Sequence, residues 1–322
     1  MKKTFILAFI FVLTLCLFPL KTNAISNSEV SLNINSPSAI LMEYSTGKIL
    51  YSKNEREKMY PASMTKMMSM YLLLDCIKKQ THSFDDMVTV SSFAASMGGS
   101  QIFLKENEKM TFEDLFTAIA VASANDAVVA LAEYTYGDVG IFIDKMNEKS
   151  KEFGMLDTNF VNTTGFHDPN HYTTTLDMAI LAKKLLSDHK EQLLKYTSIY
   201  ETYLRKDTNN PFWLVTTNKL LNSYDGMDGL KTGYTSQSGY NLTATALRDN
   251  LRLISIVMGG ETSKSRNADI TTLLNYGFNN YKSVTLYNKD ATIKNISFVN
   301  AKNSLSQIVS KEDVFYSCIF VI

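Results

Sequence analysis

A proline followed by a long apolar run constrains this chain more than any other feature. Pro61 suits the first turn of a helix, and residues 67–74 behind it are apolar almost all round, which predicts a buried helix. Ser63 and Lys66 then share one face, with Cβ atoms about 5–6 Å apart. A lysine at the mouth of a buried helix loses hydration, and this favours a neutral amine able to take a serine proton. We predict that Ser63 is a nucleophile and Lys66 its base.

The same spacing of serine and lysine occurs twice more, so spacing alone does not select Ser63. Ser45 and Lys48 flank a Thr-Gly turn between two apolar segments, which predicts a hairpin loop. Ser187 and Lys190 close a polar helix end, where a lysine complements the helix dipole. Only Ser63 combines a proline start with a buried helix behind it.

The N-terminal residues and the charge balance indicate an exported protein. Residues 1–24 combine a basic start, an apolar run over residues 5–20 and a small-residue site at 22–24, which is typical of a cleaved signal peptide. The apolar run is short for a membrane span of about 20 residues, although an uncleaved anchor stays an alternative. The 322-residue chain has 32 basic and 32 acidic residues, and this balance predicts no nucleic-acid partner.

Cysteines and histidines give little support for a disulfide framework or a metal centre. Past the signal, only Cys76 and Cys318 remain, and Cys76 falls in the predicted buried helix, where it fills core space. His167 and His171 have a ligand-like spacing, but neither a cysteine nor a third histidine accompanies them. We therefore expect neither a metal nor a cofactor.

After the predicted signal at residues 1–24, the patterns divide the rest of the chain into three parts. Residues 25–38 are polar and predicted to be loose, residues 39–282 form the main domain, and residues 283–322 form a short, possibly incomplete β-rich tail. Inside the main domain, residues 39–53 predict two short strands, and residues 111–204 are mostly helical, including 191–203. A β-rich half begins at Gly229 and contains a hairpin of residues 240–247 and 251–258, then a helix at 265–276.

Two further motifs complete a set with Ser63 and Lys66. Ser123 and Asn125 interrupt two predicted buried helices, and taken alone they are better explained as helix caps than as site residues. Lys231-Thr232-Gly233 lies on a predicted strand. Without the other motifs, Lys231 would be interpreted as a solvated charge beside a turn. Together and in this order, the three motifs are typical of penicillin-recognising acyl transferases. Acyl transfer needs a nucleophile, a base, a proton path and a cation for the terminal carboxylate, and Gly233 lets substrate backbone approach its strand.

Over residues 40–281 the chain resembles the low-molecular-weight penicillin-binding proteins, the serine D-alanyl-D-alanine carboxypeptidases. Besides the three motifs, the resemblance rests on Gly99-Ser100-Gln101, Asn162-Thr163-Thr164-Gly165-Phe166, Asp228-Gly229 with Tyr234-Thr235, and Met258-Gly259-Gly260. It implies an α/β (α+β) fold of the β-lactamase and transpeptidase type. Such a fold has an antiparallel sheet flanked by helices and a mostly helical subdomain.

The resemblance also implies a role for each matched residue. Ser63 would form the acyl-enzyme, Lys66 would take its proton, Ser123 would help to shuttle protons, and Asn125 would hold the substrate amide. Lys231, Thr232 and Arg266 would engage the carboxylate, beside Gly233, and the N–H groups of Ser63 and Tyr234 would form the oxyanion hole. The implied substrate is the peptidoglycan stem peptide, with β-lactam antibiotics as covalent inhibitors, at the cell wall or the outer face of the cytoplasmic membrane.

Three other functions remain open from the sequence. A β-lactamase would need a residue to activate the deacylating water, and no Glu-x-x-Leu-Asn segment stands between Asn125 and Lys231. An endopeptidase that cuts wall cross-links uses the same chemistry, and a catalytically silent wall-binding protein would keep the fold alone. Some relatives carry histidine where this chain has Tyr234, which leaves substrate preference open. Membrane association stays undetermined because no C-terminal amphipathic helix is visible.

Overall fold

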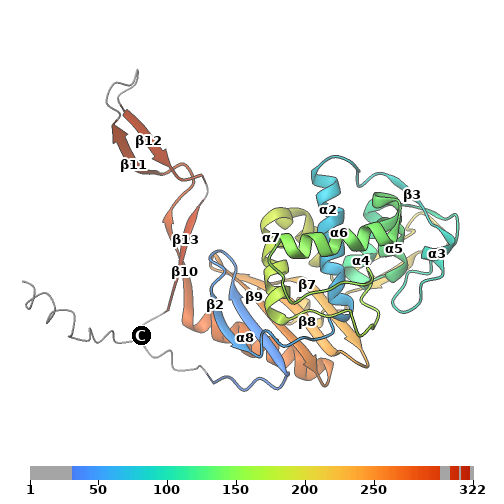
Figure 1. Cartoon of the computed structure of the whole chain (residues 1–322), viewed down its shortest axis with the longest axis horizontal. Helices are drawn as coiled ribbons and strands as arrows, with labels where there is room; N and C mark the ends of the chain where they lie inside the picture. The colour runs from blue at the N-terminus through green and yellow to red at the C-terminus, as the bar shows by residue number, and fades with distance from the viewer. Residues whose placement is uncertain (1–30, 298–304, 312, 320–322) are drawn as a thin grey trace, which may run out of the picture. The chain divides into compact units, whose positions relative to one another are not determined.

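A five-stranded antiparallel sheet in the order β2-β1-β9-β8-β7 lies at the centre of the fold (Figure 1). The structure is a computed structural model that describes residues 31–297, 305–311 and 313–319; the predicted signal at 1–24 and residues 25–30 lie outside this part. The two predicted short strands and the predicted hairpin are confirmed. The strands are β1 (Ser38–Glu43), β2 (Ile49–Lys53), β7 (Met227–Thr235), β8 (Gly239–Arg248) and β9 (Leu251–Gly260).

Helices cover both faces of this sheet, because alternate residues of its strands point to opposite sides. Ile254, Ile256 and Met258 of β9 join the main hydrophobic core, which includes α2 (Lys66–Lys78) and α7 (Thr175–Thr197). The neighbouring Leu253 lies instead against Gly277 of α8 (Ser263–Asn280). Figure 1 shows α8 on one side of the sheet and α2 and α7 on the other. The sheet is therefore buried on both sides, as the predicted fold class requires.

The helical subdomain follows the helix signals of the sequence. Thr111 caps α4 by accepting a hydrogen bond from the Asp114 N–H, and Asp138 caps α6 by accepting from the N–H groups of Gly140 and Ile141. Gly137 ends α5 in the left-handed conformation, as a glycine C-cap does. The helices are η1 (Ala62–Thr65), α2, α3 (Ser92–Ala95), α4 (Phe112–Ala122), α5 (Asn125–Tyr136), α6 (Val139–Glu152) and α7; a 3-10 turn, η2 (Lys219–Asn222), follows later.

The predicted helical segment 191–203 is partly wrong. Helix α7 continues through the polar end at Ser187 to Thr197, with non-helical dihedral angles only at His189. The chain then forms a hairpin of β5 (Glu201–Leu204) and β6 (Phe212–Val215). Tertiary packing explains both differences, because Tyr196, Leu204 and Leu214 all lie in the main core. A second short pair, β3 (Met87–Thr89) with β4 (Lys109–Thr111), borders the irregular segment that contains Gly98 and Gly99.

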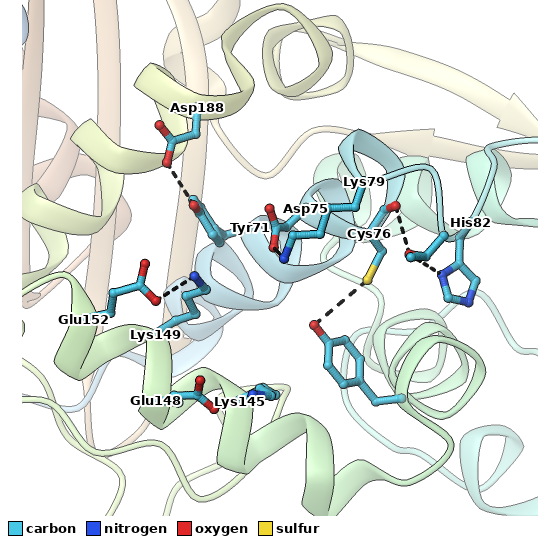
Figure 2. Close-up of polar contacts among 12 residues, drawn as sticks. Tyr71, Asp75, Cys76, Lys79, His82, Lys145, Glu148, Lys149, Glu152 and Asp188 are labelled. Atoms are coloured by element: carbon cyan, nitrogen blue, oxygen red, sulfur yellow. Dashed lines mark hydrogen bonds and ion pairs between the residues drawn. The ribbon is translucent and has the colours of Figure 1, made fainter.

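Hydrogen bonds and ion pairs surround the end of α2 away from Ser63 (Figure 2). The Tyr71 hydroxyl donates to Asp188 over 2.8 Å, and burial followed by this bond raises the pKa of Tyr71. Cys76 is a buried free thiol 3.9 Å from the Tyr136 hydroxyl, and burial raises its pKa, which suits the predicted role in the core. The ion pairs drawn nearby, such as Lys79 with Asp75, are partly exposed and add little stability.

The C-terminal strands form two antiparallel pairs, β10 with β13 and β11 with β12. Their bounds are β10 (Tyr281–Tyr287), β11 (Thr292–Ser297), β12 (Leu305–Val309) and β13 (Val314–Ile319). Among the residues that the structure describes, none of the helices has the length and apolar character needed to cross a membrane.

Candidate active site

Ser63 and Lys66 are brought together at the junction of η1 and α2. Ser63 lies in the 3-10 turn that follows Pro61. The α-helix itself begins three residues later, and Lys66 is its first residue. The Lys66 Nζ atom lies 3.1 Å from the Ser63 Oγ atom. It also donates to the Thr164 carbonyl over 2.7 Å. The predicted pair is therefore within direct proton-transfer distance.

Burial favours the neutral form of the Lys66 amine. Its side chain has no exposed surface, and this loss of hydration lowers the pKa of Lys66 well below its usual value. The positive charge of Lys231 lowers this pKa further, while Asp126 opposes the shift. A neutral amine has a lone pair for the Ser63 proton, and its N–H bond to Thr164 fixes where that lone pair points.

The turn that carries Ser63 is clamped from two sides. Asn241 of β8 donates to the carbonyls of Tyr60 and Pro61, over 2.9 and 3.3 Å. From the other side, Gly165 packs so closely that a Cβ atom there would lie 1.8 Å from the Ala62 carbonyl oxygen. Ala62 itself adopts a left-handed conformation with φ of 48°, which is costly for a residue with a side chain. Such strain is typical of functional turns and persists only where neighbours impose it.

Ser123 and Asn125 stand at the α4–α5 junction, as the sequence predicted. Ser123 ends α4 with a left-handed φ of 64°, and Asn125 begins α5. The Asn125 side chain donates to the Gly98 carbonyl over 2.8 Å, and its N–H donates to Ser100 over 2.7 Å. Within the described part of the chain, Ser123 Oγ and Asn125 Oδ1 are buried and have no hydrogen-bond partner. Buried polar atoms without a partner are uncommon in proteins, so Ser123 Oγ and Asn125 Oδ1 are candidates for contact with a substrate.

The strand that carries Lys231 runs directly beside the Ser63 turn. A Cβ atom on Gly233 would lie 2.6 Å from the Pro61 carbonyl and 3.2 Å from the Met64 nitrogen, so only glycine permits this approach. Lys231 is 1% exposed, and burial, with the nearby Arg266 charge, lowers its pKa to about 7. Because β7 is the last strand of the sheet, its outer edge can pair with an extended peptide.

The other predicted substrate residues lie near this strand with different surroundings. Thr232 Oγ1 shares a hydrogen bond of 2.6 Å with Thr217 Oγ1. Tyr234 is 55% exposed, and its ring lies 4.3 Å from that of Tyr240. Arg266 is buried; its Nη1 atom donates to the Asn241 carbonyl over 3.4 Å, and burial lowers its pKa to about 10. The Arg266 guanidinium is therefore a buried group near Lys231 and not a charge on the protein surface.

The histidines of the 162–175 loop have structural partners. His171 shares a 2.7 Å hydrogen bond with Thr65 and accepts the Val161 N–H at Nδ1, and burial lowers its pKa to about 4. His167 packs edge-on against Tyr60. Among the described residues, no group of three or more His, Cys, Asp or Glu side chains is placed to hold a metal ion.

Sequence reasoning missed three residues that build the site. Thr164 contributes a backbone carbonyl, and a backbone group cannot be recognised from the residue type. The Asn-Thr-Thr-Gly motif that contains Thr164 did support the family resemblance. Asn241 clamps the turn from a strand that reads as ordinary β structure. Asp126 is buried and accepts the N–H groups of Ile102 and Leu104, and burial raises its pKa. In the sequence, only its position beside Asn125 indicated that Asp126 could belong to the site.

A serine and a buried lysine of lowered pKa, flanked by an edge strand that carries a second lysine, form a candidate site for serine acyl transfer. The family model for D-alanyl-D-alanine carboxypeptidases matches residues 23–262, and the chain belongs to this family. The predicted family and fold class are thereby confirmed.

Individual relatives agree with this assignment. The D-alanyl-D-alanine carboxypeptidase DacF of Bacillus subtilis is 44% identical over 277 residues, which are 86% of this chain and 71% of that protein. The crystal structure of penicillin binding protein 5 from Haemophilus influenzae is 34% identical, with a TM-score of 0.81 over 90% of this chain and 84% of that chain. Penicillin-Binding Protein D2 from Listeria monocytogenes, in the ampicillin-bound form, is 31% identical, with a TM-score of 0.69 over 77% of this chain and 99% of that one. The chain spans about two thirds of the length of the curated relatives that it matches.

Proposed function

We propose that this protein is a serine-type D-Ala-D-Ala carboxypeptidase that removes the terminal D-alanine from peptidoglycan stem peptides. The observation that carries the proposal is the contact of 3.1 Å between the Lys66 amine and the Ser63 hydroxyl, in a chain of the D-alanyl-D-alanine carboxypeptidase family. Burial lowers the pKa of Lys66 well below its usual value, and this supports its role as the base.

In the acylation step, Ser63 Oγ attacks the carbonyl carbon of the penultimate D-alanine while Lys66 takes the hydroxyl proton. The N–H groups of Ser63 and Tyr234 stabilise the developing oxyanion. The peptide bond then breaks, the proton passes to the leaving amine by way of Ser123, and free D-alanine departs. The unpartnered Ser123 Oγ supports this path, because a proton carrier needs an acceptor site that the fold leaves open.

Residues at the two ends of the site hold the two ends of the substrate segment. Lys231 and Arg266 bind the terminal carboxylate, with Thr232 and the close approach at Gly233 aligning the peptide along β7. Asn125 holds the amide on the acyl side through Oδ1, which lacks a partner within the described residues. A peptide without a free terminal carboxylate leaves the buried Lys231 and Arg266 side chains without an anionic partner, and this accounts for selection of chain ends.

Water completes the cycle by attacking the ester carbonyl, which releases the shortened peptide and restores the Ser63 hydroxyl. β-Lactams mimic the substrate and acylate the same serine; the ampicillin-bound relative supports this part of the proposal. We also propose that residues 1–24 direct export and that the enzyme acts at the wall. The division into a catalytic domain at 39–282 and a β-rich tail at 283–322 remains a prediction.

Covalent labelling with a fluorescent penicillin tests the assignment. We expect slow-decaying label on the wild type and none on Ser63→Ala, with labelling slowed about 10²–10⁴-fold in Lys66→Ala because a general base is lost. Lys48→Ala is the matched control, since Ser45 and Lys48 have the same spacing in a turn. Mass analysis of a pentapeptide substrate should then show loss of one D-alanine.

Other outcomes would point to other functions. Rapid hydrolysis of the penicillin would indicate a β-lactamase, cleavage of cross-linked peptides would indicate an endopeptidase, and absence of both label and turnover would indicate a silent wall-binding protein. Normal labelling of Lys66→Ala would refute the role of this lysine as the base.

A further inference from the structure

A second hollow lies beside the active-site segment. A cavity of about 560 Å³ opens between residues 102–108 and the turn that joins β5 to β6. We name it the Phe103–Phe212 cavity; residues that line it include Phe103, Lys105, Asn107, Arg205, Asn210 and Phe212. None of these residues takes part in the acyl-transfer chemistry described above.

Hydrogen bonds tie this cavity to the catalytic machinery. Asp126, next to Asn125, accepts the N–H groups of Ile102 and Leu104, and this arrangement leaves the intervening Phe103 ring 63% exposed. On the other wall, Arg205 donates to the Ile102 carbonyl over 3.1 Å. The cavity is therefore held at a fixed position relative to Asn125.

Backbone strain is concentrated in its lining. Phe103, Asn107 and Arg205 all have left-handed backbones, with φ of 56°, 66° and 53°. This conformation is unusual for phenylalanine and arginine in particular. Strain of this kind persists where the surroundings impose it, and it gathers at ligand sites.

The side chains of the cavity suit an uncharged ring with polar substituents. The Phe103 and Phe212 rings lie edge to face with centroids 5.9 Å apart, and they offer an apolar wall. Four charged side chains line the cavity, two basic and two acidic, and the Arg205–Glu108 pair is joined over 2.8 Å. Asn107 and Asn210 supply amide groups at the same cavity. Aromatic walls with a few amides and no net charge recognise a sugar ring better than an anion or a cation.

The proposed role of Asn125 puts the cavity on the acyl side of the site. Lys231 and Arg266 mark the carboxylate end, whereas the Asn125 N–H is bonded to Ser100, three residues before Phe103. Three extended residues span roughly 10 Å. A stem peptide is joined at its other end to an amino-sugar polymer, so the polymer leaves the site on this side. We propose that the Phe103–Phe212 cavity binds an N-acetylated amino sugar of the glycan that carries the stem peptide, an inference that rests on the proposed function.

Two substrates that differ only in the sugar test this inference. The full chain is assayed for D-alanine release from a free pentapeptide and from the same pentapeptide attached to its N-acetylated disaccharide. We expect a higher kcat/KM for the glycosylated substrate. In Phe103→Ala the ratio of the two kcat/KM values should fall about fivefold to tenfold, as for loss of an aromatic anchor in a binding pocket.

Two further variants separate a sugar contact from a folding effect. Phe103→Gly removes the ring and also relieves the left-handed strain, so it should lower the ratio as Phe103→Ala does. Tyr203→Ala removes a 48% exposed ring from the opposite face of the same hairpin and should leave the ratio at its wild-type value. Equal kcat/KM values for the two substrates in the wild type, or a wild-type ratio in both Phe103 variants, would overturn the sugar site. Absence of D-alanine release from either substrate would instead overturn the proposed function.

Discussion

Gly165 offers a direct test of how the turn that carries Ser63 is held. Its φ is +89°, and a Cβ atom there would lie 1.8 Å from the Ala62 carbonyl oxygen and 2.8 Å from the Ser63 nitrogen. Real Cβ contacts essentially never fall below 3.0 Å, so Gly165→Ala must open this contact by about 1.2 Å. The neighbouring Thr164 carbonyl holds the Lys66 amine over only 2.7 Å. The substitution therefore separates the base from the carbonyl that orients it.

Gly154→Ala is the matched control for this substitution. Its φ of +79° is similarly left-handed, but no atom lies within 4 Å of the added Cβ. Left-handed strain costs about 1–2 kcal/mol in either variant. In a chain of this size each kcal/mol lowers Tm by roughly 2–4 °C, so both variants should melt several degrees early. The extra effect of Gly165→Ala then reports the contact with the Ser63 turn.

The readout is the rate of acylation by a labelled penicillin, measured below both melting temperatures. Misplacement of a catalytic group by 1 Å costs about 10²-fold in rate, and we expect this loss in Gly165→Ala. Gly154→Ala should acylate at nearly the wild-type rate. If the two variants acylate equally fast, the Thr164 carbonyl does not position Lys66 and the reasoning fails.

Three further outcomes follow from charged and titratable groups. Since the pKa of Lys231 is about 7, acylation should decline as pH rises through 7, and Lys231→Arg should move that decline to higher pH in a stopped-flow pH profile. Asp228→Ala leaves the buried Arg252 guanidinium without the partner that it holds over 2.8 Å, so the free energy of unfolding in urea should fall by about 3 kcal/mol. His171 has a folded pKa of about 4 against an ordinary 6.5, so the unfolded state binds its proton first. Stability should therefore fall by roughly 3 kcal/mol between pH 6.5 and pH 4, and by less in His171→Gln.

Local chemistry explains why much of the fold was predictable. The apolar run after Pro61 and the caps at Thr111 and Gly137 act within a few residues, and the helices that they predict are present. The Arg248-Asp249-Asn250 turn likewise joins two strands whose patterns are visible in the sequence. The β5–β6 hairpin was missed because its four-residue strands follow a helix without a break signal, and core contacts of Leu204 and Leu214 decide its structure.

The candidate site residues that act through their side chains could be predicted from the sequence. The contributions of backbone groups could not. Ser63, Lys66, Ser123 and Lys231 carry chemistry in their residue types and were found from motifs. The Thr164 carbonyl and the close contact of Gly233 with Pro61 depend on segments far apart in sequence. The burial of Arg266 is equally a property of the folded wall, since its sequence position fits a surface helix start.

The buried Lys231 shields the Lys66 amine from the negative charge at the chain end of the substrate. Burial lowers the pKa of both amines, and the pKa of Lys231 is about 7, so this lysine is only partly charged in the empty site. A carboxylate bound beside Lys231 and Arg266 favours the protonated form of Lys231. That positive charge is one of the causes that lower the pKa of Lys66. The carboxylate alone would raise the pKa of Lys66, and the protonated Lys231 offsets this effect, so the contact that selects a peptide terminus leaves the Lys66 amine able to accept the proton of Ser63.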